Sequence, residues 1–179
     1  MKLWAAVASA ARGWLLILRG EEGWRANFSL TAAGLTTALA IFAFAAFLAV
    51  GFASMSIGMP SLPGVMMAML VLAIPIAALF FALQLTRSML KQDEPLLPVL
   101  VPGVYALTAF LLVEGFLAMF GEVVMLSWLG LGYSLFRLTR SARGWSVGVA
   151  TAFAVLNVVL LVAMRLGLYM LSSALPAPS

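Results

Sequence analysis

Apolar residues along this chain form long runs, and polar residues gather between these runs instead of alternating with apolar ones. A run of about 20 apolar residues is long enough for a helix to cross the hydrocarbon core of a bilayer. The pattern therefore predicts an all-α fold, a polytopic membrane helix bundle with five transmembrane helices. The predicted spans are residues 28–54, 63–85, 97–119, 123–139 and 146–171.

The third and fourth runs are separated only by the corner Phe120, Gly121 and Glu122. A connection this short predicts a tight antiparallel hairpin of two crossing helices. A re-entrant pair, which enters and leaves on the same side of the membrane, is the alternative for residues 97–139.

Basic residues lie before the first run, between the second and third, and between the fourth and fifth. The other segments outside the runs contain none. With five crossings, all basic segments fall on one side, which the positive-inside rule makes cytoplasmic. The sequence predicts a cytoplasmic N-terminus and a periplasmic C-terminus. The basic residues concerned are Lys2, Arg12, Arg19, Arg25, Arg87, Lys91, Arg137, Arg140 and Arg143.

Residues 1–25 form a separate element, because Arg12 interrupts their apolar run and makes a further crossing unfavourable. Apolar residues recur in it at helical spacing, which predicts an interfacial amphipathic helix whose arginines lie near anionic lipids of the cytoplasmic face. A cleaved signal peptide and a docking helix for a cytoplasmic protein are the alternatives. The apolar stripe comprises Leu3, Trp4, Val7, Ala11, Trp14, Leu15 and Leu18.

Four tryptophans lie near predicted span ends or in this first element, where indole rings favour the lipid headgroup level. We expect Trp4, Trp14, Trp24 and Trp145 to be interfacial anchors. The predicted organisation is an interfacial helix (1–25), a five-helix transmembrane domain (26–174) and a short tail (175–179).

Arg165 is a charged residue inside the fifth run. Counted from the cytoplasmic starts of their runs, Arg165 lies roughly 28 Å along its helix and Glu114 roughly 26 Å along the third. We therefore predict an Arg165–Glu114 pair that fixes the third span against the fifth, with Glu122 at the outer corner as the second choice of partner. The alternative is that Arg165 snorkels to the outer headgroups.

Helix-breaking and amide residues inside the runs carry further expectations. Pro75 falls in the middle of the second run and should kink that helix. Pro102, together with Pro95 and Pro98, should make the start of the third helix irregular. Asn157 lies in the middle of the fifth run, and we expect its amide to bond a neighbouring helix.

Composition excludes most catalytic chemistry. The chain of 179 residues is 65% hydrophobic and 9% charged, and it contains neither Cys nor His. It therefore lacks a thiolate and an imidazole, and no predicted span contains an aspartate. No Gly-rich phosphate loop precedes a helix. We expect no enzyme activity, no metal, no cofactor and no nucleic-acid partner, although the net charge is +4.

Two stretches, ARGWLLILRGEEGWRANFSLTAAGL (11–35) and WLGLGYSLFRLTRSARGWS (128–146), resemble bacterial members of the Yip1-like membrane proteins. That resemblance implies five spans, a cytoplasmic amphipathic N-terminus and an outward C-terminus. Eukaryotic members are linked to vesicle trafficking and small-GTPase partners. This chain lacks their long acidic or Pro-rich cytoplasmic arm, which argues against a GTPase partner, and the family offers no catalytic residues to transfer.

Two classes of function fit these features. The first is a non-enzymatic protein of the bacterial inner membrane, a scaffold, assembly or accessory factor that acts through helix packing and lipid contact, with a protein partner or as a homo-oligomer. An excess of Arg over Lys favours a bacterial source. The second class is a small transporter, channel or lipid-handling protein that uses Arg165, Glu114 and Glu122.

Overall fold

The computed structural model describes residues 2–58, 61–91, 93–117 and 125–174, and within these ranges the chain is helical with no strand. The predicted tail, 175–179, lies outside the described residues. The elements are α1 (Lys2–Arg19), the short 3-10 helix η1 (Trp24–Asn27), α2 (Ala32–Ile57), α3 (Leu62–Leu90), α4 (Leu97–Leu117), α5 (Met125–Arg143) and α6 (Val147–Ala174).

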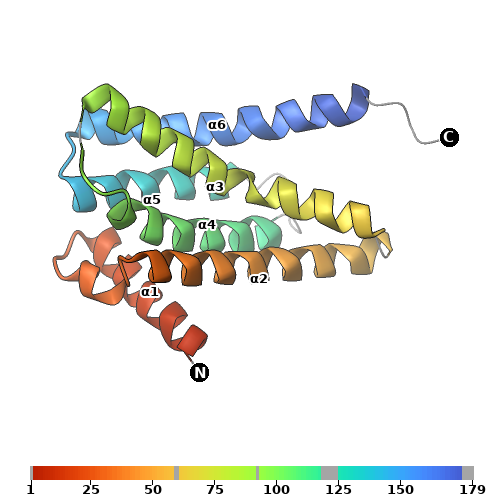
Figure 1. Ribbon diagram of the computed structural model, residues 1–179, viewed down its shortest axis with the longest axis horizontal. Coiled ribbons are helices and arrows are strands. Elements are labelled where there is room, and N and C mark those ends of the chain that lie inside the picture. Colours follow the sequence, from red (N-terminus) through yellow and green to blue (C-terminus); the bar gives the residue numbers. More distant parts are fainter. Residues whose placement is uncertain (1, 59–60, 92, 118–124, 175–179) are drawn as a thin grey trace.

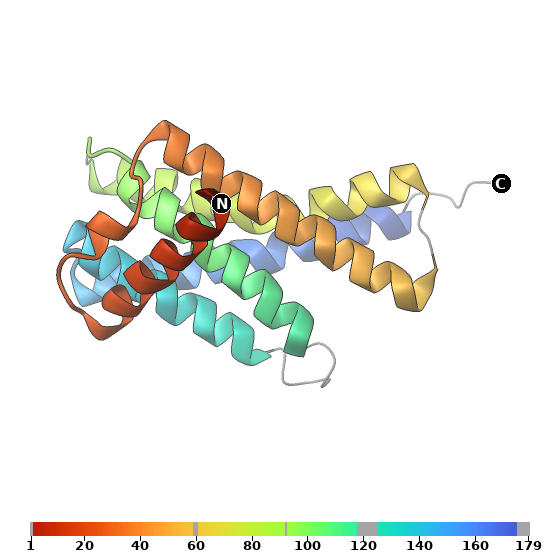
Figure 2. The same ribbon diagram turned by 90° about the horizontal axis from the view of Figure 1, so that it is seen from below.

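The helices α2 to α6 lie side by side and alternate in direction, so their connections fall at the two ends of a bundle (Figure 1 and Figure 2). α4 packs against α2 and α5, and α6 packs against α3 and α5. Of the apolar stretch of α4, 61% is buried, against 22–28% for α2, α3 and α6. α4 is therefore the central helix of the bundle.

Capping residues in the sequence fix the starts of two helices. The Thr31 hydroxyl accepts a hydrogen bond from the Gly34 amide at 3.1 Å, and Ser61 accepts one from Gly64 at 3.3 Å. Such caps satisfy amide groups that the first helical turn leaves without partners. The Thr31 cap explains why α2 begins at Ala32 and not at Phe28, where the apolar run begins.

Within the described part of the chain, four helices are long and apolar enough to cross a membrane, over Ala32–Phe52, Leu62–Leu90, Leu97–Leu117 and Val147–Gly167. α5 does not meet that criterion, so the prediction of five spans is not confirmed. The physical reason is that the 19 residues of α5 include three arginines: Arg137 lies inside the predicted span, and Arg140 and Arg143 lie past its predicted end at residue 139. α5 nevertheless lies within the bundle, beside α4 and α6.

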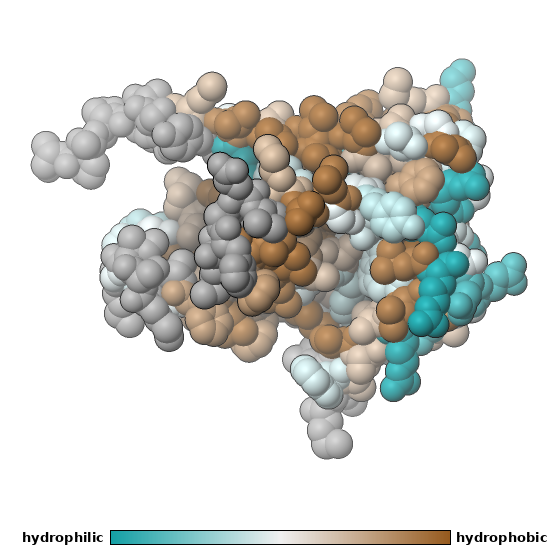
Figure 3. Space-filling model, turned by 180° about the vertical axis from the view of Figure 1, so that it is seen from behind, coloured by the Kyte–Doolittle hydropathy of each residue, from teal (hydrophilic) through white to brown (hydrophobic). Residues whose placement is uncertain are grey.

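Large apolar side chains are exposed along the flanks of the bundle, among them Phe47, Phe81, Leu129 and Val159. On the face shown in Figure 3, hydrophilic residues gather at one end and hydrophobic residues cover most of the remainder. A soluble monomer rarely exposes so extended an apolar surface. The molecule therefore has the surface of a helical membrane protein.

α1 belongs to the same hydrophobic core as the other helices, because Ala10 and Ile17 are buried in it. A methyl group at Gly13 would meet the Phe28 ring, so the small residue lets α1 approach the segment before α2. The stripe of large apolar residues predicted to anchor α1 is turned partly outward, with Trp4 79% and Leu15 54% exposed. α1 thus buries Ala10, Gly13 and Ile17 against the rest of the protein and exposes Trp4 and Leu15 to its surroundings.

Candidate functional site: an ion pair within the bundle and a cavity beneath α1

The structure brings Arg165 of α6 and Glu114 of α4 together, the pairing preferred from the depth count. Arg165 Nη1 lies 2.7 Å from Glu114 Oε1, and Nη2 lies 2.9 Å from Oε2. This bidentate geometry is the strongest that a guanidinium and a carboxylate form. Glu122, the second choice of partner, lies outside the described residues.

A third helix contributes Trp128 to the pair. The Arg165 guanidinium carbon lies 5.5 Å from the Trp128 ring centroid, which is within cation–π range. The Trp128 ring meets Phe110 edge-to-face at 6.3 Å. The sequence did not single out this role. The available signal was that Glu114 and Trp128 lie equally far from Gly121, one before it and one after it, which puts both at one depth of an antiparallel hairpin.

The pair is partly shielded, with the Arg165 side chain 25% and the Glu114 side chain 15% exposed. Each charge uses the other, so the pair as a whole is neutral and presents little free charge to a ligand. Arg165 Nε has no partner among the described residues. Neither side chain lines the cavity beneath α1 or the groove between α5 and α6 described below. This arrangement locks α4, α5 and α6 together.

Asn157, in contrast, does not make the expected interhelical hydrogen bond. Its side chain is buried in α6, and both its amide nitrogen and its oxygen lack a partner within the described part of the chain. A buried unpaired amide is costly, so this position is a local weakness of the core.

The two prolines predicted to kink helices lie inside continuous helices. α3 runs from Leu62 to Leu90 through the buried Pro75, and α4 contains the buried Pro102 near its start. The Pro102 carbonyl accepts a hydrogen bond from the Trp14 indole at 3.1 Å. Pro102 is therefore part of the surface of α4 against which α1 packs.

Of the four predicted interfacial anchors, only Trp4 is widely exposed. Trp14 is half-buried against α4 through its bond to Pro102. Trp24 and Trp145 are 4% and 5% exposed, so their rings lie inside the protein and not on the open surface that we expect of an anchor. The reason is local packing: Trp24 meets Phe28 edge-to-face at 6.1 Å, and Trp145 meets Phe153 at 5.6 Å.

Arginines at the basic end of the bundle tie α1 and the segment that follows it to α5. Arg137 of α5 donates to the Ile17 carbonyl at the end of α1 at 3.3 Å. In return, Arg25 donates to the Ala142 carbonyl at the end of α5 at 2.9 Å. Gly20, with a φ of 77°, leaves the space that the Arg137 guanidinium occupies. In these two contacts, the reciprocal arginine clasp, Arg25 gives a donor to a carbonyl in the last turn of α5, and Arg137 adds a second donor to the Ile17 carbonyl, which also accepts from the Gly20 amide at 3.1 Å.

Two further arginines fix the adjoining connections. Arg143, whose side chain is 3% exposed, pairs with Glu94 and donates to the Pro95 carbonyl at 2.7 Å. Arg140 donates to the Trp145 carbonyl at 3.0 Å. The sequence assigned these residues only to the cytoplasmic side of the membrane. Their structural roles could not be predicted from the sequence, because they depend on which loops lie next to each other in the folded protein.

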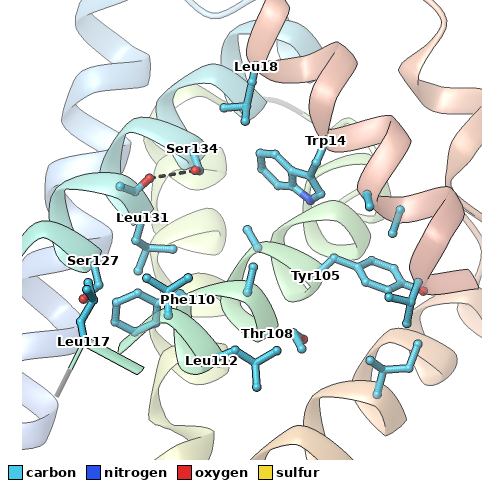
Figure 4. Close-up of a pocket in the computed structure, with 18 of the residues that line it drawn as sticks. Trp14, Leu18, Tyr105, Thr108, Phe110, Leu112, Leu117, Ser127, Leu131 and Ser134 are labelled. Atoms are coloured by element: carbon cyan, nitrogen blue, oxygen red, sulfur yellow. Dashed lines mark hydrogen bonds between the residues drawn. The ribbon is translucent and has the colours of Figure 1, made fainter. Parts of the chain in front are cut away.

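An apolar cavity of about 520 Å³ lies beneath α1, between α1, α2, α4 and α5. Figure 4 shows Trp14 and Leu18 of α1 on one side of an open centre and Phe110, Leu131 and Ser134 on the other. This volume is within the ~300–1,000 Å³ usual for ligand pockets. A second hollow, an open apolar groove of about 1310 Å³, runs between α5 and α6 past Gly132, Tyr133 and Ala154.

Among the described residues, no group of three His, Cys, Asp or Glu side chains gathers that could hold a metal ion. The chemical features of the site are therefore one neutral ion pair and two apolar hollows. Comparison with known proteins adds no further assignment: no protein-family model matches the chain, and no curated protein or solved structure is significantly similar to it.

Proposed function

We propose that this protein is a non-enzymatic integral membrane protein, a scaffold, assembly or accessory factor that acts through helix packing and lipid contact. The observation that carries the proposal is the closed Arg165–Glu114 pair. A transport path needs charges that can exchange partners with a substrate or ion. Here both carboxylate oxygens of Glu114 already face the guanidinium, and Trp128 covers it.

The proposed layout has five crossings in a bacterial inner membrane, with a cytoplasmic N-terminus and a periplasmic C-terminus. The position of α5 inside the bundle supports the fifth crossing, although its own hydropathy is low. The arginines of α1 and of the end of α5 lie at one end of the bundle, which supports the orientation. The Yip1-like proteins, which residues 11–35 and 128–146 resemble, would share this layout.

Reporter fusions test the layout. We expect a reporter active only in the cytoplasm to work at the N-terminus and one active only in the periplasm to work at the C-terminus. Exchanging the two reporters should abolish both signals. If the N-terminal and C-terminal fusions show that both termini lie in the same compartment, the layout with five crossings is wrong.

Single cysteines test whether the bundle is dry around the ion pair, since the chain has no cysteine of its own. Leu161 is buried one turn before Arg165, and Ser146 is exposed at the basic end. We expect a water-soluble maleimide to label Ser146→Cys and to leave Leu161→Cys unmodified. Rapid labelling of Leu161→Cys in a folded sample would favour the transporter or channel alternative.

The groove between α5 and α6 is the surface that we propose for helix packing with a partner or a second copy. The groove exposes large apolar side chains that another helix could cover, Leu129 at 71%, Val155 at 56% and Val159 at 55%. Native mass spectrometry of the protein released from its own membrane would show a second chain of defined mass. A monomer that carries only lipid would oppose a scaffold role.

A further inference from the structure

The cavity beneath α1 has walls suited to an apolar ligand. Its lining comes from four helices and includes Val7, Ile41, Leu112 and Leu126. The polar groups on the wall are largely engaged already. The Trp14 indole donates to Pro102, the Thr108 hydroxyl to Val104 and the Ser134 hydroxyl to Gly130. A charged or strongly polar ligand would find few donors there, so we expect a hydrocarbon chain.

α1 brings positive charge beside this cavity. Arg12 and Arg19 directly follow Ala11 and Leu18, which line it, and both arginines are exposed. Arg12 forms no ion pair with any acidic residue that the structure describes. Arg19 has only a 4.0 Å contact with the exposed Glu21. Exposed guanidinium groups near a membrane surface attract anionic headgroups.

The third observation that supports a lipid site concerns the outward face of α1. Trp4 and Leu15 are exposed although they are large and apolar, as in helices that lie at a bilayer interface. We propose that the cavity beneath α1 holds an acyl chain of an anionic phospholipid whose headgroup lies beside Arg12 and Arg19. This inference rests on the proposed function in one respect, that the bundle lies in a bilayer.

Gly130 is the position at which to fill the cavity. It lines the cavity, and a Cβ built on it would meet no atom within 4 Å. Gly130→Phe should therefore occupy the space without moving the backbone. Gly51→Phe is the matched control, because Gly51 is also helical, exposed and free of neighbours but does not line the cavity.

The probe is an anionic phosphatidylglycerol with a photoreactive group in its acyl chain, present in vesicles that contain the full chain. We expect labelled peptides from α1, α4 and α5 in the wild-type protein and in Gly51→Phe. In Gly130→Phe the labelling of the peptides that line the cavity should fall to the level of the helix surfaces outside it, because the ring occupies the space of the acyl chain. Equal labelling in all three proteins would overturn the proposal. Gly130→Ala, which adds only a methyl group, should fold and give an intermediate loss.

The headgroup is tested by the double variant Arg12→Gln/Arg19→Gln. Labelling of this variant by the anionic probe should fall by about fivefold for each arginine replaced. A zwitterionic probe should label the variant and the wild type equally, and both only weakly. Equal labelling of the wild type by both probes would overturn the anionic assignment. If no peptide of any helix is labelled, the bundle is not in the bilayer and the proposed function itself fails. Uniform labelling of all helices around the bundle would contradict only the proposal that the cavity beneath α1 holds an acyl chain, and it would leave the proposed function standing.

Discussion

Arginines at the basic end of the helix bundle have different partners from Arg165, which lies deeper in the bundle. At the basic end, Arg25, Arg137 and Arg140 donate to backbone carbonyls of loops and helix ends. Deeper in the bundle, Arg165 binds both oxygens of a carboxylate and lies against an indole ring. These three arginines therefore have neutral dipoles as partners, whereas the partner of Arg165 carries a full opposite charge.

The difference follows from the solvent available in each region. Near the membrane surface, water completes the solvation of a guanidinium, so one carbonyl contact is enough. Along the apolar stretch of a span, water is scarce and an unpaired charge costs about 2.5–3.5 kcal/mol even when it can snorkel. Arg143 lies between these cases, because its buried side chain pairs with Glu94, which is 57% exposed.

The largest effect should come from Glu114→Gln, which leaves the Arg165 charge without its partner. We expect a loss of about 2–3 kcal/mol in the free energy of unfolding. Titration with a denaturing detergent would measure it. The double variant Glu114→Leu/Arg165→Met removes both charges and should recover most of the loss. Unchanged stability of Glu114→Gln would mean that the comparison between the two regions is wrong.

Arg143→Met should cost about 1.5–2 kcal/mol, because it removes a buried donor to Glu94 and Pro95. Glu94→Gln should cost no more than about 0.5 kcal/mol, since Glu94 is mostly hydrated. Chemical denaturation of the two variants side by side measures this asymmetry. Equal losses would show that Glu94, too, is held as a buried charge.

Trp128→Leu should lower stability by about 1 kcal/mol, through loss of the contact with Arg165 and of the edge-to-face contact with Phe110. Trp128→Phe keeps a ring and should recover part of that amount. Combining Trp128→Leu with Arg165→Met in a double-mutant cycle isolates the cation–π contribution. If the stability losses of the two single variants add exactly in the double variant, Trp128 and Arg165 do not stabilise each other.

The smallest effect should come from Asp93→Asn at the basic end. The Asp93 carboxylate is fully exposed and lies 3.5 Å from Arg87. Water screens such a pair, so we expect no measurable change in the unfolding midpoint at any salt concentration. A clear, salt-dependent loss would show that the basic end depends on ion pairing more than its geometry indicates.

Helical periodicity and depth counting predicted much of the fold. The all-helical class, the positions of α2, α3, α4 and α6, and the meeting of Arg165 with Glu114 all follow from run length and rise per residue. These quantities depend only on the local chain. Residues at one depth on antiparallel helices can be matched without knowing the tertiary structure.

What escaped prediction depends on contacts between loops distant in the sequence. Trp24 and Trp145 sit near span ends, yet each packs inward on an aromatic ring, Phe28 and Phe153. The Arg143 side chain at the end of α5 contacts Glu94 and Pro95, which belong to another connection. No hydropathy pattern contains that information, because it concerns which connections share one end of the bundle.

The reciprocal arginine clasp has a consequence for biogenesis. Ile17 and Arg137 are 120 residues apart, and Arg25 and Ala142 are 117 apart. At ~5–20 residues per second, ribosomes need on the order of ten seconds to make the intervening chain. During that interval α1 has been synthesised but the part of α5 that it contacts has not. Nascent α1 must therefore lie elsewhere before it packs against α5. Its large outward-facing apolar residues, Trp4 and Leu15, suit it to wait on the surface of the bilayer.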